Sequence, residues 1–389
     1  MTSMKIEILP VHGIGDVSPG DDLPALIATA APWLRDGDVL VVTSKIVSKA
    51  EGRLVDVPTT GPERDAVREE ILAAETARVV ARRGNVRIVQ THHGFVMASA
   101  GIDASNVDPT MLVLLPKDPD ASARSLRAAL RERYGLDVAV IVSDTMGRPW
   151  RNGLVDVALG AAGISAIRDY RGEIDPYGNE LHVTQMAVID ELAAAGELVK
   201  GKCDQVPVAV IRGYLTAAEP EDGEGAAALV RDASLDLFSL GTAEAHAAGL
   251  RAAATLSDTA GDADQAEPVD RAAVMRAFAA VSDAVAPGTA FGLRTGEEVR
   301  ATVGAVPDWP SAAHMVTATV PGPHDPATLI RFGADVHRLR AALAAEGVAS
   351  TLLSPPAETG LLAVLALSRA PALPPAGVHP PAPASDSQM

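Results

Sequence analysis

The chain has 389 residues, a formal net charge of −17 and one cysteine, Cys203. The acidity argues against nucleic acid and anionic membranes as partners, and one cysteine excludes an internal disulfide and any multi-cysteine metal centre. The length predicts two domains. Because the sequence has neither a signal peptide nor an apolar run of about 20 residues, we expect a cytoplasmic protein without a membrane span.

The first part of the chain alternates between strand-like and helix-like patterns. We expect strands at residues 5–9 and 38–42, and helices at residues 23–34 and 62–83. The loop at residues 10–16 contains two glycines, which allow a ligand to approach the backbone closely. It is not a Walker loop, since no Gly-Lys-Ser/Thr follows it.

Two lysines spaced four residues apart follow the second expected strand. Lys45 and Lys49 alternate with serines in the segment 43–53. On one helix face or one loop wall they would present ammonium and hydroxyl donors to a polyphosphate. A solvated lysine turn fits this segment equally well when it is taken alone.

A polar turn, AGIDASNVD at residues 100–108, follows two further expected strands at residues 85–90 and 94–99. Asp103 and Asn106 in this turn could both face an ion or a phosphate. Because Asp and Asn are also the commonest turn residues, the turn alone does not establish a site.

A second polar segment follows an expected helix at residues 116–135 and an expected strand at residues 137–142. It places Asp144 and Thr145 directly after the strand. Two strand ends that each offer an aspartate beside a hydroxyl or an amide predict one shared metal site.

Two arginines around a tryptophan come next, in the sequence GRPWRNG. Arg148 and Arg151 could hold an anionic aromatic substrate by bidentate hydrogen bonds and stacking; surface arginines beside a packed tryptophan are the alternative. Residues 154–166 have no clear periodicity. We expect a helix at residues 183–199, with Asp190 and Glu191 on a solvated face, and a buried strand at residues 206–211.

The last third differs in composition. The expected organisation is a first domain at residues 1–250, a linker at 251–268, a C-terminal extension at 269–370 and a disordered tail at 371–389. Within the extension, residues 269–284 and 327–346 are helix-like.

Five motifs in consistent order, SKIVSKAEGR, AGIDASN, VSDTMGRPWRNG, DPYGNELHVT and VPVAVIRG, resemble the coenzyme F420-0:L-glutamate ligase family of the actinobacterial type over residues 4–249. The resemblance implies an α/β fold with mixed sheets, followed by a small α/β extension that is similar to a degenerate nitroreductase-like domain. It also implies a homodimer. The extension is short and has no arginine-rich opening motif, so we do not expect it to bind FMN.

The resemblance also implies a site. Members of the family hold GTP at positions that correspond to Ile14, Gly15, Asp16, Val17, Ser44, Lys45, Lys49 and Asn106. They hold Mg²⁺ or Mn²⁺ at positions that correspond to Asp103, Asp144 and Thr145. The catalytic set would be Asp103, Asp144 and Lys49, and potassium is a further ion to consider. The loop at residues 200–205 has lysine where a carboxylate is expected, which leaves a second metal ion with an incomplete shell unless Asp204 or water completes it.

The implied activity is the GTP-dependent addition of L-glutamate, and of further γ-linked glutamates, to coenzyme F420-0 through an acyl phosphate. Two alternatives are a related metal-dependent amide ligase or phosphotransferase that acts on another carboxylate, and a non-catalytic protein that binds the deazaflavin.

Overall fold

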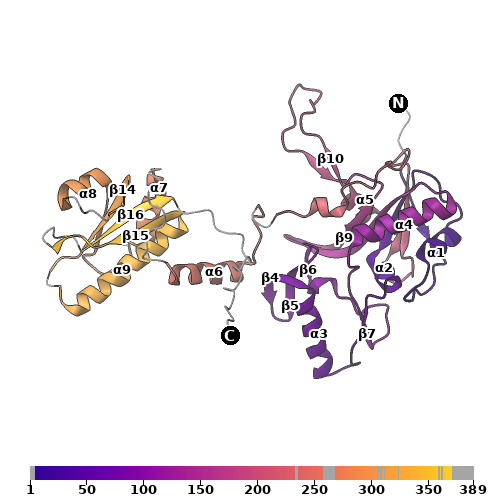
Figure 1. Ribbon diagram of the computed structural model, residues 1–389, viewed down its shortest axis with the longest axis horizontal. Coiled ribbons are helices and arrows are strands. Elements are labelled where there is room, and N and C mark those ends of the chain that lie inside the picture. Colours follow the sequence, from indigo (N-terminus) through magenta and orange to yellow (C-terminus); the bar gives the residue numbers. More distant parts are fainter. Residues whose placement is uncertain are drawn as a thin grey trace, which may run out of the picture. The chain divides into compact units, whose positions relative to one another are not determined.

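The computed structural model describes residues 5–232, 235–256, 268–304, 306, 309–310, 312–322, 324–357, 360 and 362–369. The chain divides into two compact units, Met1–Gly241 and Thr242–Met389. Both units combine helices with sheets (Figure 1), so the expected mixed α/β class is confirmed. Most of the expected linker and the expected tail from residue 371 lie outside the described residues.

A five-stranded mixed sheet forms the centre of the first unit, in the order β1-β12-β2-β8-β9. Only β2 and β8 pair in parallel; the other neighbours are antiparallel. The strands are β1 (Glu7–Val11), β12 (Val208–Arg212), β2 (Val39–Thr43), β8 (Ala139–Arg148) and β9 (Arg151–Ala162).

Helices cover both faces of this sheet. Along β8, Val140 and Val142 pack in one apolar cluster with α1 (Leu23–Ala30), α2 (Ser44–Ala50) and α4 (Pro119–Tyr134). Ala139 and Ile141 pack in another cluster, with α5 (Val188–Lys200). This alternation is the period-two pattern of a strand that is buried on both faces. If it continues along β8, even-numbered residues face α2 and odd-numbered residues face α5.

Smaller elements surround the central sheet. Two of them pair as β3 (Leu54–Asp56) with β7 (Met111–Val113), and three form the sheet β4 (Thr76–Arg83), β5 (Val86–Thr91) and β6 (Val96–Ala98) beside α3 (Pro62–Ala74). The short helices η1 (Ser99–Gly101) and η2 (Ala226–Leu229) follow β6 and β12 in the chain. Strands β10 (Ile167–Asp169) and β11 (Gln185–Ala187) pair at the base of a long hairpin that projects from the unit (Figure 1).

Four of the expected elements are wrong in extent or type. The helix expected at residues 23–34 ends at Ala30. The helix expected at residues 62–83 ends at Ala74, and Thr76–Arg83 is strand β4. Its pairing with β5 has two register shifts, which disrupt the alternation by which a strand is recognised. The strand expected to end at residue 142 continues to Arg148, and the helix expected from residue 183 begins at Val188.

The second unit is built on an antiparallel sheet in the order β13-β14-β16-β15. Helices α7 and α9 pack against one face of it and α8 against the other. The elements of this unit are α6 (Thr242–Ala254), α7 (Arg271–Val281), β13 (Ala290–Thr295), α8 (Gly296–Val303), β14 (His314–Thr319), α9 (Pro326–Ala345), β15 (Val348–Leu353) and β16 (Ala363–Arg369).

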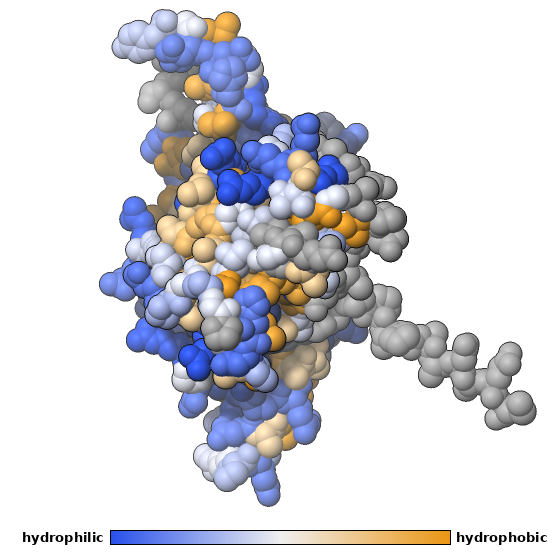
Figure 2. Space-filling view, turned by 90° about the vertical axis from the view of Figure 1, so that its left-hand side faces the viewer, coloured by the Kyte–Doolittle hydropathy of each residue, from blue (hydrophilic) through white to orange (hydrophobic). Residues whose placement is uncertain are grey.

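The surface is mixed in polarity. Figure 2 shows hydrophobic patches separated by hydrophilic residues on the visible face. Within the part of the chain that the structure describes, no helix combines the length and the apolar character that a membrane crossing needs.

Gly160 lets β9 and α4 approach each other closely. A Cβ atom at Gly160 would overlap the carbonyl oxygen of Pro119 and lie 2.7 Å from the backbone nitrogen of Asp120. Because backbone atoms cannot move aside as a flexible side chain can, we expect Gly160→Ala to lower the free energy of unfolding by about 2–3 kcal/mol. Urea denaturation measures this change. Gly147→Ala is the matched control, because a Cβ atom at Gly147 on β8 meets nothing within 4 Å; equal losses in the two variants would contradict the close approach.

Candidate functional site

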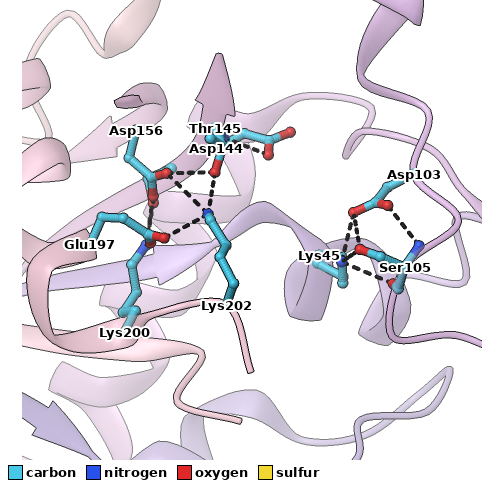
Figure 3. Close-up of polar contacts among 10 residues, drawn as sticks. Lys45, Asp103, Ser105, Asp144, Thr145, Asp156, Glu197, Lys200 and Lys202 are labelled. Atoms are coloured by element: carbon cyan, nitrogen blue, oxygen red, sulfur yellow. Dashed lines mark hydrogen bonds and ion pairs between the residues drawn. The ribbon is translucent and has the colours of Figure 1, made fainter. Parts of the chain in front are cut away.

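Helix α2 presents two lysines to the loops around it. Lys45 and Lys49 are one turn apart and so lie on the same side of the helix. The ammonium group of Lys45 lies 2.6 Å from Asp103 Oδ2 and donates to the hydroxyl and carbonyl oxygens of Ser105 at 2.8 and 2.9 Å. Figure 3 shows the side chains of Lys45 and Ser105 directed at the Asp103 carboxylate. The lysine segment is therefore helical and partnered, which excludes a solvated lysine turn.

Lys49 joins two loops that are far apart in the sequence. It is 7% exposed and donates at 2.9 Å to both Asp16 Oδ1 and the carbonyl oxygen of Asn106. Asn106 has a left-handed backbone (φ 54°), a conformation that asparagine tolerates better than most residues. The lysine thus connects the glycine-containing loop to the AGIDASN turn.

The glycine-containing loop is anchored by its apolar residues. Ile14 and Val17 are buried in the core, whereas a Cβ atom at Gly13 or Gly15 would meet nothing within 4 Å. The side chain of Asp16 is exposed apart from its ion pair with Lys49. The loop therefore presents open backbone beside a buried cation, as close contact with an anionic ligand requires.

Asp103 and Asp144 line one small pocket of about 10 Å³, together with Ser44, Lys45 and Ser48. This volume is close to the room needed by a single water molecule. Although burial alone would raise the pKa of Asp103, hydrogen bonds from Lys45 and Ser105 and the charge of Lys45 outweigh it, so the pKa is lowered. Burial, followed by the charges of Asp156 and Asp103, raises the pKa of Asp144 to about 6, despite hydrogen bonds from the Thr145 amide and the Ser44 hydroxyl. A cation near these two carboxylates would be stabilised by both of them.

Thr145 lies on the other side of β8, because neighbouring residues of a strand face opposite ways. Its hydroxyl donates to Asp156 Oδ1 at 2.7 Å and accepts from Lys202 Nζ at 2.7 Å. It is not among the residues that line the pocket of Asp103 and Asp144. The structure therefore brings the two predicted aspartates together but directs the third predicted metal ligand elsewhere.

A buried ionic cluster that the sequence analysis missed surrounds Asp156. Lys200 is 2% exposed and donates to Asp156 Oδ2 at 2.8 Å and to the Ser143 hydroxyl at 2.9 Å. Ser143 in turn donates to Asp156, and Glu197 pairs with Lys202 at 2.6 Å (Figure 3). Burial would raise the pKa of Asp156, but the charge and hydrogen bond of Lys200 lower it. The available signal was the pair of lysines at the end of an apolar helix, since charge at a buried helix end requires a partner.

Comparison with known proteins places this site in a family. The sequence model of the F420-0:gamma-glutamyl ligase family matches residues 13–213, which include both glycines of the glycine-containing loop, α2, the AGIDASN turn and Asp144. The chain belongs to the F420-0:gamma-glutamyl ligase family.

Relatives of similar length to the first unit support this assignment. The chain is 41% identical to the coenzyme F420:L-glutamate ligase of Methanothermobacter thermautotrophicus over 251 residues, which are 60% of this chain and 99% of the relative. It is 40% identical to the enzyme of that name from Methanopyrus kandleri, over 61% of this chain and 98% of the relative. It is also 40% identical to the enzyme of that name from Haloarcula marismortui, over 60% of this chain and 95% of the relative. The rest of this chain has no counterpart in these alignments.

Two arginines that were predicted to bind substrate lie apart from the pocket in this member of the gamma-glutamyl ligase family. Arg148 and Arg151 are exposed at the turn between β8 and β9, where Arg148 donates to the carbonyl oxygen of Asn152. Trp150 between them is 84% exposed and meets Phe238 edge-on. A strand rises about 3.3 Å per residue, so four residues place Arg148 roughly 13 Å beyond Asp144.

We expect Lys200→Met to lower the free energy of unfolding by roughly 3–5 kcal/mol, because Asp156 would remain buried without its cation. Chemical denaturation measures the loss, and a second substitution, Asp156→Asn, should restore part of it. The matched control is Lys202→Met, two residues away. Because the side chain of Lys202 is 61% exposed, this substitution should lower the free energy of unfolding by no more than about 1 kcal/mol. If both variants lost a similar free energy of unfolding, the buried pair of Lys200 and Asp156 would contribute no more to stability than an exposed lysine does.

Proposed function

We propose that this chain adds L-glutamate to coenzyme F420-0, and then further γ-linked glutamates, in a reaction driven by GTP. Membership of the family supports the choice of substrates, and the names of the relatives specify them. The observation that carries the proposal is the convergence of Asp103, Asp144 and Lys45, from three separate segments, on one pocket. Lys49 lies one helical turn from Lys45 and donates to the carbonyl oxygen of Asn106 in the turn that carries Asp103.

The chemistry accounts for a site of this composition. A carboxylate and an amine do not condense in water, because oxide is a very poor leaving group. In the proposed reaction the terminal carboxylate oxygen of F420-0 attacks the γ-phosphorus of GTP, and the bond to the β-phosphate oxygen breaks to release GDP. The amine of glutamate then attacks the acyl phosphate, the carbon–oxygen bond to phosphate breaks, and an amide and inorganic phosphate remain. Both steps need charge neutralisation and positioning more than covalent help from the protein.

The lysines of α2 are suited to holding the phosphates. Each is already paired with a carboxylate or carbonyl oxygen at the edge of a loop, and phosphate oxygens can replace those acceptors without moving the helix. Lys49 lies between the glycine-containing loop and Asn106, so a nucleotide held there would contact Ile14, Gly15, Asp16 and Val17 on one side and Asn106 on the other.

Asp103 and Asp144 would hold a divalent cation, Mg²⁺ or Mn²⁺. Their oxygens are the hard donors that these cations prefer. Among the described residues, no group of three or more His, Cys, Asp or Glu side chains could hold a metal ion, which fits Mg²⁺ sites that use one or two carboxylates and complete the shell with substrate phosphates and water. When bound, the cation neutralises phosphate charge during transfer. For a second ion, the charge of Asp156 is already offset by Lys200, and the Thr145 hydroxyl already accepts from Lys202, so the residues of this chain favour a single cation here.

Asp144→Asn should reduce glutamylation at least about 100-fold, because the amide cannot provide the charge that holds a cation or balances the lysines. Mass spectrometry of the deazaflavin after incubation with GTP, L-glutamate and Mn²⁺ measures the product. The control is Asp65→Asn, an exposed aspartate on α3. Normal turnover in the Asp144 variant would remove this residue from the site. Replacing F420-0 with other carboxylates in the same assay distinguishes the proposal from an amide ligase of another specificity.

Lys49→Met should raise the KM for GTP by about tenfold or more while leaving the KM for glutamate within about twofold, because it removes one charge-assisted hydrogen bond to phosphate and keeps the buried stem. Initial rates at varied GTP and varied glutamate give both constants. Lys5→Met, at a side chain 78% exposed, should change neither. An unchanged KM for GTP would rule out phosphate binding by Lys49.

A further inference from the structure

A second cavity lies at the outer edge of β9, within the first unit. It has a volume of about 250 Å³ and is lined by residues from six segments of the chain, including a second carboxylate, Asp236, which accepts from the backbone N–H of Phe238. The residues that matter here are Arg78, Phe95, Met146, Val157, Asp190 and Arg231. We call this cavity the β9-edge pocket.

The wall of the β9-edge pocket begins beside the proposed catalytic carboxylate. Val157 on β9 is the direct register partner of Asp144 on β8, and Met146 is two residues beyond Asp144. All three side chains therefore face the same side of the sheet. Directly opposed residues in an antiparallel pair have Cβ atoms about 5 Å apart, so a molecule in the pocket can extend to the place where the carboxylate of F420-0 would be activated.

Asp190 provides a fixed carboxylate with one oxygen to spare. Its Oδ1 accepts from the backbone N–H of Ala158 at 2.9 Å, while its Oδ2 has no hydrogen-bond donor among the residues that the structure describes. Burial raises the pKa of Asp190, because no cation offsets the loss of water around this half-buried group. An ammonium group is the ligand that satisfies such an oxygen.

Two guanidinium groups supply the opposite charge. Arg78 donates to Gln90 Oε1 at 2.6 Å and to the carbonyl oxygen of Ser239, and both acceptors are neutral. Arg231 is exposed. Within the described part of the chain neither arginine has a carboxylate partner, so each can still bind one. Phe95, Met146 and Val157 form an apolar wall against which methylene groups can pack.

We propose that the β9-edge pocket is the subsite for L-glutamate, with its ammonium group on Asp190, its carboxylates on Arg78 and Arg231, and its methylene groups against the apolar wall. This inference rests on the proposed function. The volume is below the range of about 300–1,000 Å³ that accommodates drug-sized ligands, so the pocket suits an amino acid better than a nucleotide or a tricyclic deazaflavin.

The test uses the full-length protein and two matched pairs of variants. Asp190→Asn keeps an acceptor for the Ala158 amide but loses the charge; Glu191→Gln, the exposed next residue of α5, is its control. We expect Asp190→Asn to raise the KM for glutamate about 10- to 100-fold and to leave the KM for GTP and for F420-0 within about twofold. Arg231→Gln should raise the KM for glutamate as well, whereas Arg83→Gln, at an exposed arginine of β4, should not. Because Arg231 is on the surface, its variant remains informative if Asp190→Asn does not fold.

A binding measurement separates this inference from the proposed function. Isothermal titration of L-glutamate into the protein, with a non-hydrolysable GTP analogue and Mn²⁺ present, should show binding that Asp190→Asn abolishes and Glu191→Gln retains. If the wild-type protein makes no glutamylated product but shows this pattern, the proposed activity fails and the subsite stands. If the wild-type protein is active and the Asp190 and Arg231 variants leave the KM for glutamate unchanged, or shift the KM for F420-0 instead, the subsite assignment is overturned while the activity stands.

Discussion

The alternation of side chains along β8 is the constraint on which the arrangement of the site depends. One strand, buried on both faces, must send Asp144 toward α2 and Thr145 toward α5. The lysines of α2 and the AGIDASN turn therefore lie on the side of β8 that Asp144 faces, and the Asp156 cluster lies on the side that Thr145 faces. The charge of Asp156 still acts across the strand, because it contributes to the raised pKa of Asp144.

Exposure distinguishes the two environments. The side chains of Lys200 and Asp156 are each 3% exposed, so separating them would leave charges in a medium of low dielectric at a cost of several kcal/mol. The side chains of Lys45 and Asp103 are 19% and 41% exposed, and water can replace either partner during an exchange. Phosphate can therefore compete for Lys45, whereas Lys200 stays with Asp156, which accepts hydrogen bonds from Ser143 and Thr145. The buried cluster positions the strand, and the half-buried one is available to ligands.

Much of the site could be predicted from the sequence, because its residues lie in short motifs that residue type and spacing identify. The AGIDASN turn and the lysine pair were recognisable from residue type and spacing, and the structure places Asp103, Asp144 and Lys45 at one pocket. Asp156 gave no such signal: β9 is buried on both faces near its end and has a bulge where Ser143 pairs with Ala158, so neither alternation nor helical period was visible. Whether Thr145 shares the site of Asp144 depends on where β8 ends, and strand ends are poorly defined by apolar runs alone.

Two aspartates beside the bulged edge of β9 differ in how many of their oxygens the fold already uses, and this difference separates a structural carboxylate from one that can bind a ligand. An edge strand has unpaired backbone N–H groups that need acceptors, and two aspartates supply them. Asp120 uses both oxygens, accepting from Ala161 and Ala226 with Oδ1 and from Ala227 with Oδ2. Asp190 uses only one, for Ala158. The first carboxylate is saturated by the fold and therefore fastens η2 to the sheet. The fold fixes the second carboxylate, Asp190, through a single oxygen, and this residue lines the β9-edge pocket. Its other oxygen is therefore available to a small cation without a large loss of side-chain freedom on binding.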